Sequence, residues 1–192
     1  MGDALHLVFA LSAIAWSVGA LLLPTVVTLP TLLFMLPLAT FVLAKLVVGP
    51  LLYWRRVPCS VAEILGASIA GMAVSHGIAR GVIAGLFGRN ARFEVTQKGV
   101  VIATPMRAAA SAVREEALML LLLAVAACLL ALSATPASAT SLAANSVSAH
   151  RALWIAMLLL QALPYAAALL CTWLSTRPEA HTVALNRAAS DA

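Results

Sequence analysis

The side chains able to do chemistry are concentrated in one polar passage of an otherwise apolar chain, residues 75–99. His76 and Arg80 lie four residues apart, a spacing that places both on one face of a helix. Further basic residues follow, among them Arg89 and Lys98. A basic block of this kind, held between long apolar segments, indicates contact with a partner in the cytosol.

The composition excludes an ordinary soluble domain. The 192 residues are 63% hydrophobic and 10% charged, whereas soluble domains carry about 25% charged residues. The net charge of +5 is typical of basic loops that set membrane topology. Aromatic residues are only 6% of the chain and form no stacking motif, so we expect the lipid bilayer, and no nucleic acid, as a partner.

The cysteines predict no metal site. Cys59, Cys128 and Cys171 form neither a CxxC motif nor a Cys/His spacing suited to metal ligation. Free cysteines in apolar surroundings behave as small hydrophobic residues. We therefore expect inert thiols and no metal bound by this chain.

Four apolar runs approach or exceed the length of about 20 residues that a helix needs to cross a bilayer. The connectors between the first two runs and between the last two, residues 24–31 and 133–149, carry no charge. The sequence predicts an all-α membrane protein with four transmembrane helices, and with a cytoplasmic interfacial helix and a loop between the second and third spans; that this loop is of the gating type is what the resemblance described below implies. The predicted spans are Leu5–Leu23, Leu32–Tyr53, Ala117–Leu132 and Ala152–Leu174.

The basic residues predict the orientation of these spans. Eight of the twelve lie between the second and third runs, and the positive-inside rule assigns that block to the cytoplasm. Four spans then place both termini in the cytoplasm as well; that the membrane is a bacterial inner membrane is what the resemblance described below implies. The predicted segments are a transmembrane hairpin at 1–54, a cytoplasmic block at 55–116, a second hairpin at 117–176 and a flexible tail at 177–192.

A capping box predicts the start of a helix inside the cytoplasmic block. Ser60 and Glu63 have the spacing at which each side chain satisfies a free backbone amide of the first turn. The residues that follow, to Phe87, form a broad apolar face interrupted by polar side chains. This pattern favours a helix lying in the membrane interface. A fifth, more polar span is the alternative.

Residues 88–99 predict a loop. Gly88 and Gly99 bracket a run in which Phe93, Val95 and Thr96 have strand propensity. The run is either a mobile functional loop or a solvated connector.

Two polar residues inside the predicted spans each have two interpretations. The Lys45 side chain either extends toward the cytoplasmic interface or faces a polar path within the bundle. Gln161, followed by Pro164, either marks a kink that lines a cavity or makes a hydrogen bond between helices.

Several of these residues together form a recognisable pattern. With apolar spans before and after, it resembles the carboxy-terminal membrane part of processive family-2 glycosyltransferases, the cellulose-synthase-like and bacterial β-glucan synthases. In these enzymes an FxVTxK motif forms a gating loop between an interfacial helix and the next span. The matching residues are Ser75-His76, Arg80, Gly85-Leu86-Phe87, Phe93, Val95-Thr96 and Lys98-Gly99.

The resemblance implies roles for the loop residues. Phe93, Val95, Thr96 and Lys98 would form the substrate-binding gating loop, with Thr96 and Lys98 meeting the diphosphate of a nucleotide-sugar. Possible supporting residues are His76, Arg80, Arg89 and Arg92. Gln97 stands where relatives commonly carry proline, which loosens the loop without removing its polar contacts.

The family's catalytic residues are missing. Its cytosolic aspartates and QxxRW motif do not occur here, because the only aspartates are Asp3 and Asp191. No residue of this chain is predicted to be catalytic, and glycosyl transfer would require a catalytic partner chain or upstream region that binds the nucleotide-sugar, the growing glycan and Mg²⁺. The chain would then be part of a split synthase, a truncated product or a relic. The alternatives are a four-span scaffold or assembly subunit, and a small transporter.

Overall fold

The computed structural model describes residues 2–30, 32–87, 106–133 and 142–176. Every regular element in these ranges is an α-helix. The helices are α1 (Gly2–Leu22), α2 (Leu32–Arg56), α3 (Val61–Ala73), α4 (Ser75–Phe87), α5 (Met106–Ala112), α6 (Arg114–Leu132) and α7 (Leu142–Ser175).

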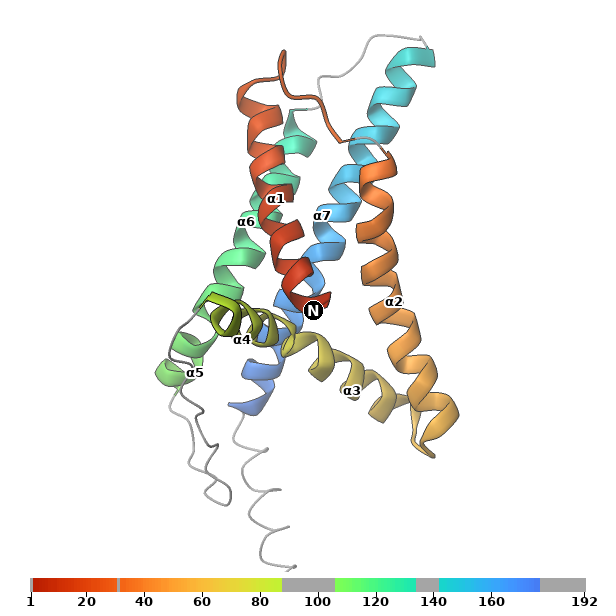
Figure 1. Cartoon of the computed structure of the whole chain (residues 1–192), viewed down its shortest axis with the longest axis vertical. Coiled ribbons are helices and arrows are strands. Elements are labelled where there is room, and N and C mark those ends of the chain that lie inside the picture. Colours follow the sequence, from red (N-terminus) through yellow and green to blue (C-terminus); the bar gives the residue numbers. More distant parts are fainter. Residues whose placement is uncertain (1, 31, 88–105, 134–141, 177–192) are drawn as a thin grey trace, which may run out of the picture.

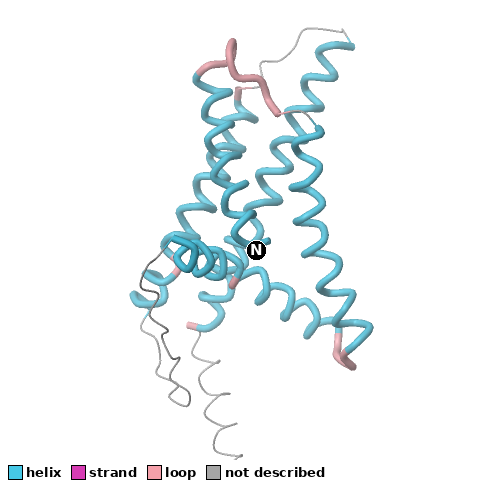
Figure 2. Tube along the Cα trace, in the orientation of Figure 1, coloured by secondary structure: helices cyan, strands magenta, loops and turns pink. Residues whose placement is uncertain are grey.

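The long helices α1, α2, α6 and α7 run along the long axis of the molecule (Figure 1). The connection from α1 to α2 lies at one end of this bundle, and α3 and α4 run across the other end (Figures 1 and 2). Helix α7 is central, because it contacts α6, α3, α2 and α1. The buried core includes Ala10, Met35, Leu123, Trp154 and Leu158.

The outer surface of the bundle identifies a membrane protein. Large apolar side chains such as Leu11, Leu121 and Leu159 are about half exposed, as expected for helices that face lipid. Four helical stretches are long and apolar enough to cross a bilayer: Asp3–Leu22, Val61–Phe87, Arg114–Leu132 and Val147–Ser175. Helix α2, with 25 residues, lies alongside the other long helices.

The stretch Val61–Phe87 qualifies as a span by length and composition but differs from the others in its course. It is divided into α3, which ends at Ala73, and α4, which begins at Ser75, with Val74 as the C-cap residue between them. Both parts cross the end of the bundle instead of running along it (Figure 1). The predicted capping box is confirmed: the Ser60 N–H donates to Glu63 Oε2 at 2.7 Å, and the Glu63 N–H donates to Ser60 Oγ at 3.3 Å.

Helix α7 begins earlier than the sequence predicted. The predicted connector ran to residue 149, whereas the helix starts at Leu142 and is 34 residues long. At about 1.5 Å per residue it is ~51 Å long, which exceeds the ~30 Å of a bilayer's hydrocarbon core. His150 and Arg151 follow these additional residues, so the helix carries a charge near this end of the bundle although residues 133–149 are uncharged.

Candidate functional site

Polar side chains from four helices meet inside the end of the bundle that α3 and α4 cross. We call this group the polar junction: the buried residues His6, His76, Glu116, Gln161 and Tyr165, with Arg80 and Glu115 at its edge. His6 comes from α1, His76 and Arg80 from α4, the two glutamates from α6, and the remaining two residues from α7. Each of the five interior residues is at most 9% exposed.

Glu115 joins α4 to the start of α6. Its Oε2 lies 2.9 Å from Arg80 Nη1 and 3.5 Å from His76 Nε2. The His76 contact is within ion-pair distance, but its geometry is not that of a hydrogen bond. The side chains of Arg80 and Glu115 are 57% and 47% exposed, so their ion pair contributes about 0–1 kcal/mol to stability. Its main effect is to fix the position of α4 relative to the start of α6.

Tyr165 connects the histidines of two other helices. Its ring centroid lies 5.9 Å from that of His6 and 5.6 Å from that of His76. Both distances fall in the range of about 4.5–7 Å that is typical of interacting rings. Since Tyr165 is only 1% exposed, α1 and α4 meet on a buried face of α7.

The interior of the polar junction has unused hydrogen-bonding capacity. Tyr165 Oη, Glu116 Oε2 and both amide atoms of Gln161 are buried and have no hydrogen-bond partner within the described part of the chain. Burying such an atom unpaired costs about 1–3 kcal/mol. The junction is therefore held together against the cost of these unpaired buried groups.

A second buried contact holds α1 against α7 nearer the middle of the bundle. Trp154 Nε1–H donates to Ser17 Oγ at 3.0 Å, and the Ser17 hydroxyl donates to the Ala13 carbonyl at 2.8 Å. Both donors are therefore satisfied within the apolar core.

The structure brings together two of the residues predicted from the sequence, His76 and Arg80, at Glu115. The predicted loop as a whole lies outside the described residues, and with it the other predicted site residues: Arg89, Arg92, Phe93, Val95, Thr96 and Lys98.

Of the polar residues predicted inside the spans, Lys45 has a side chain that also lies outside the described part of the structure. Gln161 is fully buried, and Pro164 lies within α7 one turn later.

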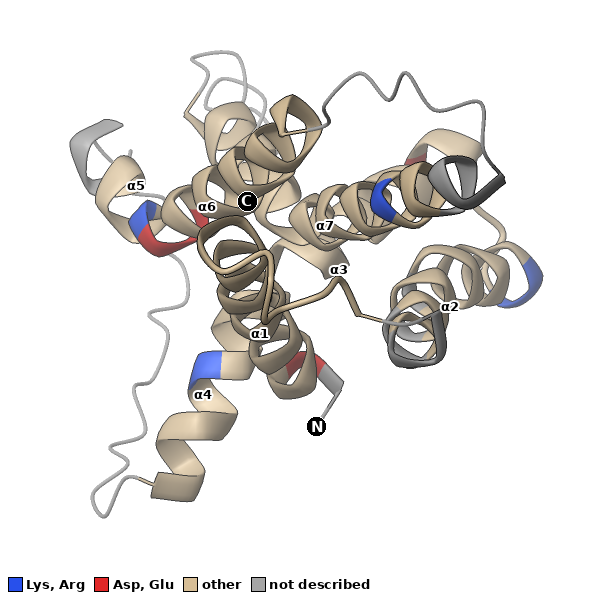
Figure 3. Cartoon of the chain, turned by 90° about the horizontal axis from the view of Figure 1, so that it is seen from above, with Lys and Arg blue, Asp and Glu red and all other residues tan. Residues whose placement is uncertain are grey.

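Sequence reasoning missed the acidic part of the junction. Glu115 and Glu116 were not singled out as site residues, although two adjacent carboxylates directly before an apolar run were a usable signal. His6 and Tyr165 had no such signal. Charged residues are sparse over the part of the chain that the structure describes (Figure 3). The same residues contain no group of three or more His, Cys, Asp or Glu arranged to hold a metal.

Comparison with known proteins gives no relative: no family model, no curated protein and no solved structure matches this chain.

Proposed function

We propose that this chain is the membrane channel and gating part of a processive family-2 glycosyltransferase that makes or exports a β-linked polysaccharide from nucleotide-sugar. The order of its elements supports the proposal. Two long helices are followed by the crosswise pair α3–α4, then by residues 88–105 with their FxVTxK motif, and then by two more long helices. This is the layout that the resemblance implies.

The contact of Arg80 with Glu115 is the observation that carries the proposal. Residues 88–105 connect α4 to α5, and α5 leads directly into α6. The ion pair holds α4 against the start of α6, so both anchors of this segment are fixed at one end of the bundle. Fixing the ends of a loop reduces the conformational entropy that it loses when it closes on a substrate.

In this proposal α3 and α4 lie in the cytoplasmic interface of a bacterial inner membrane, and both termini are cytoplasmic. The charges support this orientation, because Arg55 and Arg56 end α2 on the same side as the crosswise helices. A catalytic partner supplies the aspartates and Mg²⁺. Thr96 and Lys98 contribute a hydroxyl and an ammonium group to the nucleotide diphosphate.

Co-expression with a candidate catalytic half tests the proposal through polymer formation from radiolabelled nucleotide-sugar. Thr96→Ala and Lys98→Ala should each lower synthesis by about tenfold, because each removes a contact to the diphosphate. Thr25→Ala, on the loop at the other end of the bundle, is the matched control and should leave synthesis unchanged. Equal amounts of each protein in the membrane fraction show that insertion is intact. Full synthesis by both loop variants contradicts the gating role.

The polar junction favours a second candidate, a small transporter. Buried polar residues between membrane helices commonly mark ion or proton paths, and Glu116 and Gln161 lie where such a path would pass between α6 and α7. Proton flux by the purified chain alone in proteoliposomes, lowered in Glu116→Gln, would support this candidate over the synthase.

A further inference from the structure

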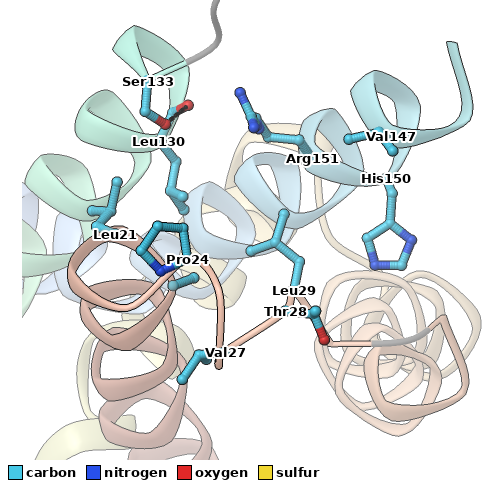
Figure 4. Close-up of a pocket in the computed structure, with 11 residues that line it drawn as sticks. Leu21, Pro24, Val27, Thr28, Leu29, Leu130, Ser133, Val147, His150 and Arg151 are labelled. Carbon is cyan, nitrogen blue, oxygen red and sulfur yellow. Dashed lines mark hydrogen bonds between the residues drawn. The ribbon is translucent and has the colours of Figure 1, made fainter. Parts of the chain in front are cut away.

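A cavity of about 730 Å³ lies at the opposite end of the bundle from the polar junction. It is an open pocket lined by the connection between α1 and α2, the last turn of α6 and the early turns of α7 (Figure 4). Most of its wall is apolar, including Leu21, Pro24, Leu29 and Leu130. Ser133 and Arg151 are among its polar residues.

Arg151 is the charged residue of this cavity. Figure 4 shows its side chain reaching from α7 toward the end of α6 that carries Leu130 and Ser133. Its Nε is buried and has no hydrogen-bond partner within the described residues. The sequence contains no aspartate or glutamate from residue 4 to 62 or from 117 to 178. The segments that line the cavity, and the connector between α6 and α7, therefore supply no carboxylate to Arg151.

Two hydrogen bonds fix the wall of the cavity. Trp16 Nε1–H donates to the Thr28 carbonyl at 2.7 Å and holds the connection from α1 to α2 against α1. The His150 ring contacts the Pro30 carbonyl through Nε2, so this nitrogen carries the proton and donates. His150 is thus engaged with the residues before α2, and the Arg151 guanidinium remains the group able to meet an anion.

We propose that this cavity binds the phosphate group of an anionic phospholipid, with Arg151 as its charged contact. A guanidinium presents donors in a planar fork that suits phosphate oxygens. The apolar wall suits the adjoining acyl chain, whereas free phosphate gains nothing from it.

The position of the cavity also suits a lipid. It lies at the end of helices that cross the bilayer, which is the depth at which lipid headgroups are found. An arginine at the non-cytoplasmic end also departs from the usual distribution of basic residues. The inference does not depend on the proposed synthase activity.

Native mass spectrometry of the purified chain tests the lipid site. The protein is offered equal amounts of phosphatidylglycerol, which is anionic, and phosphatidylcholine, which has no net charge. We expect the wild-type chain to retain phosphatidylglycerol preferentially, and Arg151→Gln to lower its retention by about tenfold. Arg151→Lys should recover part of the preference. The matched control is Arg55→Gln, which removes an exposed arginine at the other end of the bundle and should keep the preference.

A second variant covers the case in which Arg151→Gln does not fold. Ser133→Phe places a large side chain in the cavity while keeping the arginine, and it should also lower phosphatidylglycerol retention. Unchanged retention in either folded variant overturns the proposal. Displacement of the lipid by millimolar inorganic phosphate overturns the choice of a lipid, because it shows that the acyl chain adds no affinity. Equal retention of both lipids by the wild-type chain overturns the role of charge.

Discussion

Individual buried hydrogen bonds hold the helices of this protein in register. Trp154 and Ser17 lie in the apolar core, where neither finds water. A polar pair in such a place favours one packing of α1 on α7, because any other packing leaves the indole N–H unsatisfied. Hydrogen bonds between membrane helices contribute modestly to stability, about 0.6 kcal/mol on average and up to ~1.7 kcal/mol.

Ser17→Ala should therefore lower the free energy of unfolding by about 1 kcal/mol, because it leaves the Trp154 N–H unpaired. Trp154→Phe should remove the same hydrogen bond. In a double-mutant cycle measured by denaturant unfolding in micelles, the double variant should be destabilised by less than the sum of the single variants. Ser12→Ala, on an exposed position of α1, is the control. Strict additivity would show that the two side chains do not interact.

At the scale of the helices, the crosswise pair α3–α4 is fixed by a cap at its start and by an ion pair in the first half of α4. The capping box begins α3, and Arg80 and His76 hold α4 on Glu115. Breaking the ion pair changes the total stability little, since both partners are about half exposed. The expected effect is local: α4 opens more often, and the residues after it lose a fixed anchor.

Arg80→Glu should increase hydrogen exchange across residues 75–87 several-fold, because it places two carboxylates together at the edge of the polar junction. The charge-swapped chain, with Arg80→Glu and Glu115→Arg, should return exchange toward the wild-type rate. Arg56→Glu, at the end of α2, is the control for an added negative charge. Exchange that stays elevated in the swapped chain would show that Arg80 does not hold α4 through Glu115.

Local sequence features predicted the helices well and the site only in part. The four long apolar runs and the capping box at Ser60 depend on residues close together in the chain, and the helices occur where these signals stand. The start of α7 was missed because residues 142–149 lack the hydropathy of a span, although their alanines favour a helix. The polar junction was missed because it joins His6, His76 and Tyr165, and no local pattern shows that these residues meet.

At the scale of the whole molecule, the course of α3–α4 decides the topology. If this pair lies across the end of the bundle, α2 is the only membrane crossing between residues 25 and 92, which then lie on opposite sides. If the pair spans instead, two crossings separate these residues and they lie on the same side. Residue 138 follows one further crossing, α6. It therefore shares a side with residue 25 in the first arrangement and lies opposite it in the second.

Cysteine labelling with a membrane-impermeant maleimide separates these arrangements. The native thiols Cys59, Cys128 and Cys171 are first replaced by alanine, and Thr25→Cys, Arg92→Cys and Ser138→Cys are then tested singly in intact cells and in inverted vesicles. We expect labelling at 25 and 138 only in cells, and at 92 only in inverted vesicles, because the basic block is retained in the cytoplasm. Labelling of 25 and 92 from the same side would make α3–α4 a span. Arg80 and Glu115 would then lie at a membrane boundary that no cytosolic partner reaches.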